Sequence, residues 1–368
     1  MVKLGKVLSF MLASVLCLTL SALALPAEAA DESSPAANGN RLEESTDSRY
    51  GWLDHVNLHG LIEVEASYVN VDSAPPGTDS TDSDLTLATV ALGIDVDIVK
   101  HVSGHVLFLW EGDDSEPLEV DEAGIYLDGE DIIPLYLEAG KLYLPFGNFA
   151  SHFISDPLTH ELGETRESAV IAGYTNETLD LSFGVFNGDI DERGDNNRID
   201  NFVASGVFSL PEETVPGLEL VAGISWISDL ADSNVLQDEI AVSAINNKID
   251  GISAFVSVAL WERGSLIAEY LSALDTFEAG ELSFDDGKRL RPETWNFEAG
   301  YALTDALEIA LRYEGGKDLG DLLPDRQYGI VASYCLFENT VLSIEYLHGE
   351  FANNDEQDLL TAQFAFEF

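Results

Sequence analysis

Seven histidines and a large excess of carboxylates are the residues of this chain that could do chemistry. His101 and His105 stand four residues apart, a spacing that brings two metal ligands together on a helix. The surrounding sequence predicts a turn and the start of a strand there, so this spacing indicates no metal site. His160 opens the run His-Glu-Leu-Gly-Glu, which lacks the second histidine of a zinc protease. We therefore expect no catalytic residue, no bound metal and no cofactor.

Residues 189–194, Asp-Ile-Asp-Glu-Arg-Gly, partly match a calcium-binding loop. Arg193 stands where such a loop needs an oxygen donor, which favours an ordinary solvated loop. Weak divalent-ion binding that bridges to lipopolysaccharide stays open as the alternative.

Many of the other acids lie in segments where apolar and polar residues alternate. Ile62 and Val64, for example, alternate with Glu63 and Glu65, as expected for a strand whose two faces meet different surroundings. The same period of two recurs in about sixteen segments. They lie near 62–68, 90–98, 103–111, 120–128, 134–143, 167–174, 178–187, 201–209, 217–227, 251–261, 265–274, 294–302, 306–315, 326–336, 340–348 and 359–368.

The connections between these segments alternate between short and long. Short turns such as 175–178, 262–265 and 303–306 separate longer polar stretches such as 187–200 and 228–250. Short periplasmic turns opposite long outer loops are the arrangement of transmembrane barrels. A β-sandwich would also have many strands, but not this parity along the whole chain. The sequence therefore predicts an all-β fold, a transmembrane antiparallel up-and-down β-barrel of about sixteen strands.

Composition narrows the class of protein further. The formal charge of −50 disfavours nucleic-acid binding, because a protein neutralises phosphates with basic residues. A hydrophobic content of 46% argues against disorder. Beyond the amino-terminal region, no apolar run reaches the ~20 residues that a membrane helix needs. An exported protein of the outer membrane of a Gram-negative bacterium fits all three observations.

The amino-terminal region predicts export. Lys3 and Lys6 precede an apolar run, and Ala27-Glu28-Ala29 supplies the small residues of a cleavage site. We expect residues 1–29 to be a signal peptide, residues 30–50 a short periplasmic linker, and residues 51–368 the barrel.

The last strand ends on an aromatic residue, Phe368. Outer-membrane barrels carry such a strand as the sorting signal for the barrel-assembly machinery, so we expect Phe368 to be the assembly signal. A terminal strand of a soluble sheet is the alternative for this segment alone.

The predicted inward faces carry many acids and few bases. A lumen lined by one sign of charge concentrates the opposite ion, so we expect a preference for cations. Acids that lie only at the rims, where they serve solubility, are the alternative. The candidate pore-lining residues are Glu63, Glu65, Asp95, Asp97, Glu122, Glu138, Lys141, Glu269, Glu298, Arg312 and Glu345.

The connection 145–166 is too apolar for a free surface loop, with Phe146, Phe149 and Phe153 among its residues. A loop folded inward would bury these rings against the barrel wall and narrow the pore. A lid over the barrel mouth is the alternative. The candidate constriction residues are Phe149, Phe153, Asp156, Glu161, Glu164 and Arg166.

Four runs around this connection carry a resemblance. GKLYLPFG (140–147), ISDPLT (154–159), ELGET (161–165) and FNGD (186–189) resemble the siderophore porin family typified by the legiobactin receptor (LbtU-type). The resemblance covers about residue 55 to the end and implies a sixteen-stranded outer-membrane barrel that takes up iron chelates without a plug domain. This chain has only a short segment before the barrel, without a coiled-coil stretch, so a docking role of such a segment is not carried over.

The sequence thus predicts an outer-membrane porin that lets small solutes diffuse down their gradients, with ferric siderophores as the solute that the resemblance implies. A general cation-preferring porin is the alternative, because many ferric chelates are anionic and this lumen is acidic. A barrel enzyme is the third possibility; it would need a serine–histidine pair facing the lipid. The expected partners are outer-membrane lipid, lipopolysaccharide and the barrel-assembly machinery; the oligomeric state, including a homo-oligomer, stays open.

Overall fold

The computed structural model describes residues 55–368, apart from 75–76, 113–117, 130–131, 195–197 and 212–213. The predicted signal peptide and linker lie outside the described residues. The strands are β1 (Val56–Asp72), β2 (Ser80–Val99), β3 (Val102–Glu111), β4 (Glu119–Asp128), β5 (Leu135–Tyr143), β6 (Arg166–Thr175), β7 (Leu179–Asn187), β8 (Asn201–Ser209), β9 (Leu218–Ile227), β10 (Gly251–Leu260), β11 (Gly264–Ala273), β12 (Glu293–Ala302), β13 (Leu307–Lys317), β14 (Arg326–Phe337), β15 (Thr340–Glu350) and β16 (Glu356–Glu367). The helical segments are α2 (Leu158–Gly163), η2 (Leu230–Asp232) and α3 (Asn234–Asp238).

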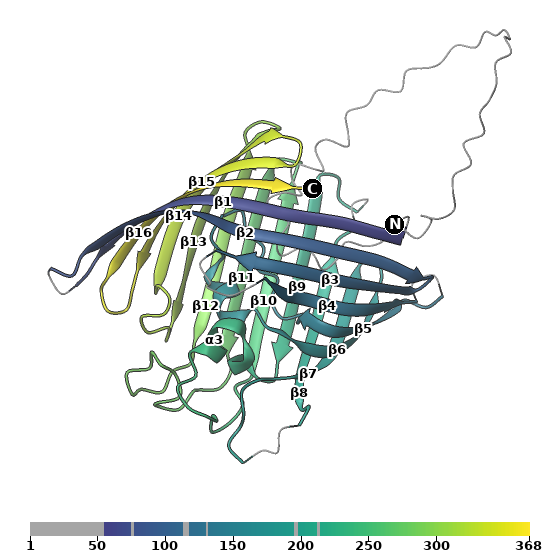
Figure 1. The fold of residues 1–368 in the computed structure, drawn as a ribbon, viewed down its shortest axis with the longest axis horizontal. Coiled ribbons are helices and arrows are strands. Elements are labelled where there is room, and N and C mark those ends of the chain that lie inside the picture. The colour runs from purple at the N-terminus through teal and green to yellow at the C-terminus, as the bar shows by residue number, and fades with distance from the viewer. Residues whose placement is uncertain (1–54, 75–76, 113–117, 130–131, 195–197, 212–213) are drawn as a thin grey trace, which may run out of the picture.

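These strands form one closed antiparallel barrel. Each strand pairs with its neighbours along the chain, and β1 closes the ring by pairing with β16 (Figure 1). Closure satisfies the backbone groups of every strand, which an open sheet edge in a membrane would leave unpaired. The predicted fold, a barrel of about sixteen antiparallel strands, is confirmed.

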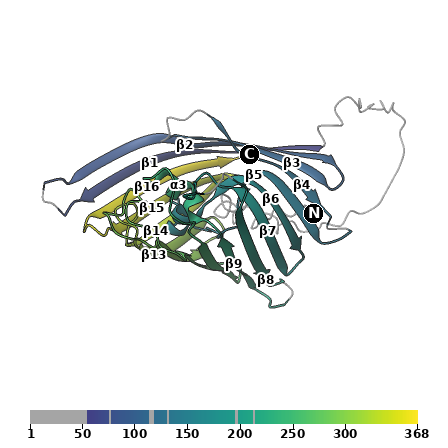
Figure 2. The ribbon, with the colours of Figure 1, turned by 90° about the horizontal axis from the view of Figure 1, so that it is seen from below.

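The predicted parity of the connections holds as well. Residues 261–263, 303–306 and 338–339 make short turns at one end of the barrel, whereas 228–250 and 274–292 make long connections at the other. Figure 2 looks at the barrel from below, and α3, part of the connection 228–250, lies inside the ring of strands.

Alternation separates the two faces of the wall. On β12 and β13, the outward side chains of Phe297, Leu311 and Tyr313 are about half exposed, while the inward Glu298 and Arg312 are buried. Apolar and aromatic side chains on the outer face with polar ones inside fit a wall that meets lipid. Among the residues that the structure describes, no helix is both long and apolar enough to cross a membrane.

Strand β2 is longer than the alternation predicts. It starts at Ser80 rather than near Val90. The alternation did not predict this start, because Ser80 to Asp84 are polar on both faces. They still pair with β1, and together the two strands extend beyond their neighbours in Figure 1.

Phe368 lies at the seam where the barrel closes. Its backbone exchanges two hydrogen bonds with Gly60 of β1, at 2.9 and 3.0 Å. Its ring stacks on Phe366 and is half exposed. The role of Phe368 as an assembly signal stays a prediction.

A hydrophobic core fills part of the barrel interior. Leu142, Ile171, Phe186 and Leu271 on the inner faces of β5, β6, β7 and β11 pack with residues of the long connections. The connecting residues in this core include Phe146, Phe149, Leu162, Leu230, Leu236, Ile245, Phe277 and Leu319. Burying such side chains contributes ~1.5–3 kcal/mol each, which explains why these connections fold inward.

Candidate functional site: a constricted lumen

The connection between β5 and β6, residues 144–165, enters the barrel and is called the inward loop below. The backbone N–H of Leu144 donates to the carbonyl of Thr165 at 2.8 Å and closes the base of the loop. Phe146, Phe149 and Leu162 join the interior core. The predicted inward position of the apolar residues is therefore what the structure shows, and packing against the wall is the physical reason.

Four glutamates on the inner wall hold the backbone of the inward loop. They are called the carboxylate row: Glu269 on β11, Glu298 on β12, Glu314 on β13 and Glu345 on β15. All four are buried. A carboxylate that accepts backbone N–H groups fixes a loop strongly, because charge-assisted hydrogen bonds are about twice as strong as neutral ones.

The first half of the inward loop meets the members of the carboxylate row on β11 and β12. Glu269 accepts from the N–H groups of Asn148 and Phe149, at 2.8 and 2.9 Å. Glu298 accepts from the N–H of His152 at 2.7 Å.

The second half of the inward loop reaches the glutamate on β15 and then turns back to the one on β13. Glu345 accepts from the N–H groups of Ile154 and Ser155, at 2.7 and 3.1 Å. Glu314 accepts from the N–H of Leu158 at 2.8 Å, where α2 begins. The loop therefore contacts the wall at β11, β12, β13 and β15 instead of hanging freely in the lumen.

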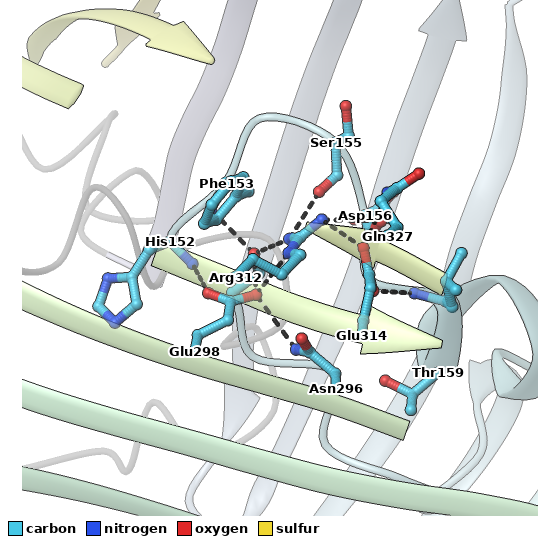
Figure 3. A network of polar contacts seen from close by, with 12 residues as sticks. His152, Phe153, Ser155, Asp156, Thr159, Asn296, Glu298, Arg312, Glu314 and Gln327 are labelled. Carbon is cyan, nitrogen blue, oxygen red and sulfur yellow. Dashed lines mark hydrogen bonds and ion pairs between the residues drawn. The ribbon is translucent and has the colours of Figure 1, made fainter. Parts of the chain in front are cut away.

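Arg312 on β13 is the cation at the centre of this arrangement (Figure 3). Its guanidinium donates to Glu298 at 2.9 Å and contacts Glu314 at 3.4 Å, and all three side chains are fully buried. It also donates to the carbonyl of Ser155 at 2.9 Å and lies 4.3 Å from the ring centroid of Phe153. Arg312 thus compensates part of the buried negative charge and touches the loop directly.

His152 clamps the inward loop near the short turns. Its Nδ1 lies 2.7 Å from Glu308 and its Nε2 lies 2.8 Å from the hydroxyl of Ser265. Burial opposes protonation of His152, yet Glu308 raises the pKa of the imidazole.

The order serine, histidine, carboxylate in this clamp is that of a hydrolase triad. The side chain of His152 is only 9% exposed and lies under the loop that it holds. Both of its ring nitrogens are occupied by groups of the wall. We therefore interpret the three residues as a structural clamp.

A second histidine, His160, supports the turn of α2. It lies 2.7 Å from Glu164 and 3.5 Å from Asp156, each one helical turn away. Burial lowers the pKa of His160, but the nearby carboxylates outweigh burial and raise it to about 10. Burial, with repulsion from Asp156, raises the pKa of Glu161 to about 7, so Glu161 loses its charge below neutral pH.

The inward loop leaves a cavity on the opposite side of the lumen, which is called the passage below. Its volume is about 1030 Å³, including the part open to solvent. One side is formed by β1 to β4 and the other by the inward loop. Its lining includes His59, Gly60, Leu61, Thr89, Ala91, Gly93, Leu107, Leu109, Asp121, Glu122, Tyr143, Leu144, Phe146, Gly147, Phe149, Glu164, Thr165 and Glu367.

Acids of the inward loop lie near acids of the facing wall. Asp156 of the inward loop lies within electrostatic range of Glu63 on β1, and Glu164 within range of Glu122 on β4. The side chain of Asp156 is about half exposed. Acids of two opposite walls therefore meet in the narrow part of the lumen.

The predicted pore-lining residues divide into three groups. Glu63, Glu65, Asp95, Asp97, Glu122 and Glu138 lie on inward positions of β1, β2, β4 and β5. Glu269, Glu298, Arg312 and Glu345 also point inward, but they are buried under the inward loop and do not meet open water. Lys141 is the exception: it alternates with the buried Leu142 and Glu138, so it lies on the outer face, where it contacts the carbonyl of Val120.

The structure places all but one of the six predicted constriction residues together inside the barrel. Phe149, Phe153, Asp156, Glu161 and Glu164 all lie on the inward loop. Arg166 instead begins β6, where it forms ion pairs with Asp121 and Glu119 of β4. Its role is therefore to join two strands at the rim of the passage.

Sequence reasoning missed a cluster on the first three strands. His59 on β1, Asp95 on β2 and His105 on β3 have ligand atoms that all lie within 4.8 Å of one another. A second set, Asp156, His160 and Glu161, lies on the inward loop. The alternation predicted that Asp95 faces inward. The neighbouring histidines follow only from the register between strands, which the sequence does not give.

Similarity searches add relatives to this geometry. No family model matches the chain. It is 26% identical over 308 residues to a UPF0422 protein of Coxiella burnetii, covering 80% of this chain and 64% of that protein. It is 26% identical over 325 residues to a UPF0422 protein of Legionella pneumophila, covering 80% of this chain and 58% of that protein. The chain thus spans less than two thirds of the length of these relatives.

Solved structures match the barrel. The outer membrane channel DcaP of Acinetobacter baumannii matches with a TM-score of 0.59 and 15% identity, over 85% of this chain and 97% of that one. An anion-selective porin from Comamonas acidovorans matches with a TM-score of 0.61 and 14% identity, over 85% and 99%. The chain therefore has the barrel fold of these two proteins and is similar in sequence to the UPF0422 proteins of Coxiella and Legionella.

Proposed function

We propose that the chain is an outer-membrane porin through which small solutes diffuse passively. The observation that carries this proposal is the inward loop, which is tied along the wall from β11 to β15 and leaves the passage beside β1 to β4. A barrel of this size leaves a water-filled channel unless its own residues fill it. The two solved structures with the same barrel fold, an outer membrane channel and a porin, support the porin proposal.

The proposal includes the place and the processing of the protein. A signal peptide at residues 1–29 would direct export, a linker would occupy 30–50, and the barrel would insert in the outer membrane of a Gram-negative bacterium. Lipid, lipopolysaccharide and the barrel-assembly machinery are then its partners. The half-exposed apolar outer face supports the membrane location.

The ion preference that we propose is for cations. Glu122 and Glu164 line the passage, Glu63 and Asp156 lie within electrostatic range of each other in the lumen, and a lumen of one charge sign concentrates the opposite ion. The Comamonas porin with the same fold is anion-selective, so fold alone does not decide the sign. The acids in the lumen of this chain are what supports a preference for cations.

The triple variant Glu63→Gln, Asp156→Asn and Glu164→Gln should lower cation selectivity. At 0.01 M salt the screening length is ~30 Å, so these charges act across the passage, whereas at 1 M it is ~3 Å. The reversal potential across a planar bilayer in a salt gradient should therefore move towards zero at low salt and hardly change at high salt.

The matched control removes three acids at the short turns, in the variant Glu262→Gln, Asp305→Asn and Glu338→Gln. These residues are exposed and lie outside the narrow part of the lumen, so the reversal potential should stay close to that of the wild type. An anion-selective wild-type pore at low salt would refute the cation preference while leaving the porin proposal intact.

A narrower form of the proposal names ferric siderophores as the solute. Its support is the resemblance of residues 140–189 to the LbtU-type siderophore porins. The negative lining adds a condition: neutral or cationic ferric chelates should pass more easily than anionic ones.

Liposomes that contain the protein should therefore take up a neutral ferric chelate faster than an anionic chelate of similar size. The reason is repulsion of the anionic chelate by the acids at the passage. Uptake is measured from radioactive iron in the liposomes, with protein-free liposomes as the control. Equal exclusion of all ferric chelates, alongside free passage of small sugars, would leave a general porin as the function.

A further inference from the structure

We propose that His59, Asp95 and His105 form a binding site for one divalent transition-metal ion on the wall of the passage. The site goes beyond the proposed function, because it rests on side-chain geometry and not on transport. It is built on three adjacent strands, β1, β2 and β3.

The strand register brings the three residues together. Asp95 lies directly opposite His105 in the pairing of β2 with β3. In the pairing of β1 with β2, His59 lies opposite Gly93, two residues from Asp95 on the same face. Side chains that are opposite or diagonal on one face of a sheet are close enough to share a ligand.

The distances are close to those of a metal site. His59 Nε2 lies 3.3 Å from Asp95 Oδ2, and His105 Nδ1 lies 2.6 Å from Asp95 Oδ1. A tetrahedral zinc ion, bound at ~2.0–2.1 Å, needs donor atoms about 3.3 Å apart. Small rotations of the imidazoles and the carboxylate are enough to reach this geometry.

The chemistry of the donors selects the class of metal. Two imidazole nitrogens with one carboxylate suit Zn²⁺, Ni²⁺ or Cu²⁺, whereas Mg²⁺ and Ca²⁺ prefer oxygen ligands alone. Glu122 lies 3.9 Å from Nε2 of His105, the nitrogen that would not bind the metal. A carboxylate at that nitrogen would orient the imidazole ring of the ligand.

The position gives the ion access. His59, Gly93 and Glu122 line the passage, and the side chain of Asp95 is 44% exposed. Gly93 is required here, because a Cβ at this position would lie 2.1 Å from the ring of His59. The two imidazoles stack with centroids 6.1 Å apart and 16° between their planes. Both rings therefore converge on Asp95 from the two neighbouring strands.

The other candidate set, Asp156, His160 and Glu161, fits a metal less well. His160 already has Glu164 at one ring nitrogen and Asp156 near the other. A metal would have to displace contacts that hold α2 in place. The cluster of His59, Asp95 and His105 on β1 to β3 does not hold the inward loop, so a metal there would not disturb α2.

The experiment measures Zn²⁺ binding by calorimetry, with untagged, chelator-treated protein in detergent and excess Mg²⁺ to suppress binding to carboxylates alone. The wild type should bind one Zn²⁺ per chain. His59→Ala and His105→Ala should each weaken binding by at least about tenfold, since even partners behind the ligands typically contribute 10–100-fold.

The matched control is His348→Ala. His348 also pairs with an aspartate, Asp358 at 2.8 Å, but it lies on the outer face of β15 and has no second histidine in the described metal-ligand sets. This variant should bind Zn²⁺ like the wild type. Paramagnetic resonance of bound Cu²⁺ should show two nitrogen donors in the wild type and one in His59→Ala.

Wild-type protein that binds no Zn²⁺ under these conditions would overturn the proposal. Equal binding by the wild type and the two lumenal histidine variants would also overturn it, since the ion would then sit elsewhere. Heat-dependent gel mobility shows whether each variant is folded. If His105→Ala fails to fold, the partly exposed His59 still decides the question. None of these results depends on whether the barrel transports solutes.

Discussion

Replacing residues 149–161 by a short glycine–serine linker should raise single-channel conductance by at least about twofold, because these residues occupy lumen that would otherwise carry ions. The segment includes Phe149 and Phe153, which pack against the inner wall, and most of α2. Its removal would join the passage to the part of the lumen beside β11 to β15. Conductance in planar bilayers at high salt is the measurement, since screening then leaves pore width as the main determinant.

The same deletion should also change ion preference. It would expose Glu269, Glu298, Glu314 and Glu345, which now accept hydrogen bonds from the inward loop, against the single cation of Arg312. Cation selectivity at low salt should therefore rise together with conductance.

A deletion in another connection serves as the control for the loop experiment. Residues 352–354 between β15 and β16 are exposed and lie outside the interior core, so their removal should leave conductance unchanged. If deletion of 149–161 also left conductance unchanged, the loop would not limit ion flow, and the idea of a constriction would have to be abandoned.

The sequence was sufficient to predict the wall of the barrel but not the way its interior is filled. Strands such as β12 and β13 alternate so regularly that their faces follow from the period of two alone. The parity of short and long connections then implies an even number of strands. The polar start of β2 was not predicted, because residues 80–84 lack the apolar face on which the alternating pattern depends.

The carboxylate row shows why the site was harder to predict. Alternation put Glu269, Glu298 and Glu345 on the inward face, but it implied contact with water. Their partners are backbone N–H groups more than a hundred residues away in sequence, for example Ile154 for Glu345. A backbone N–H carries no sequence signal, so only the fold reveals that these acids hold a loop.

The histidines show a different limit. His101 and His105 attracted attention because they are close in sequence, yet His101 lies in the turn before β3, and in extended chain residues four apart are separated by about 13 Å. His59 and His105 are 46 residues apart and meet because β1 and β3 both flank β2. Strand register, which one sequence does not supply, decides this pair.

Arg312→Met should be the most destabilising single substitution on the inner wall. The side chain of methionine keeps much of the volume but removes the charge that compensates Glu298 and Glu314, both fully buried. Breaking a buried ion pair by removing one partner typically costs ~3–5 kcal/mol, because the remaining charge stays buried and unpaired. The loss should appear as a lower free energy of unfolding in urea, followed by tryptophan fluorescence and gel mobility in detergent.

The control for this substitution is Arg263→Met. Arg263 is half exposed and lies 3.5 Å from Asp305 at a short turn, where an ion pair contributes at most ~1 kcal/mol. The double variant Arg312→Met with Glu298→Gln tests the electrostatic cause, since removing one of the stranded carboxylates should restore part of the lost stability. If Arg312→Met were as stable as Arg263→Met, the carboxylate row would not need its cation. The inward loop would then be held by the packing of Phe146, Phe149 and Phe153 instead.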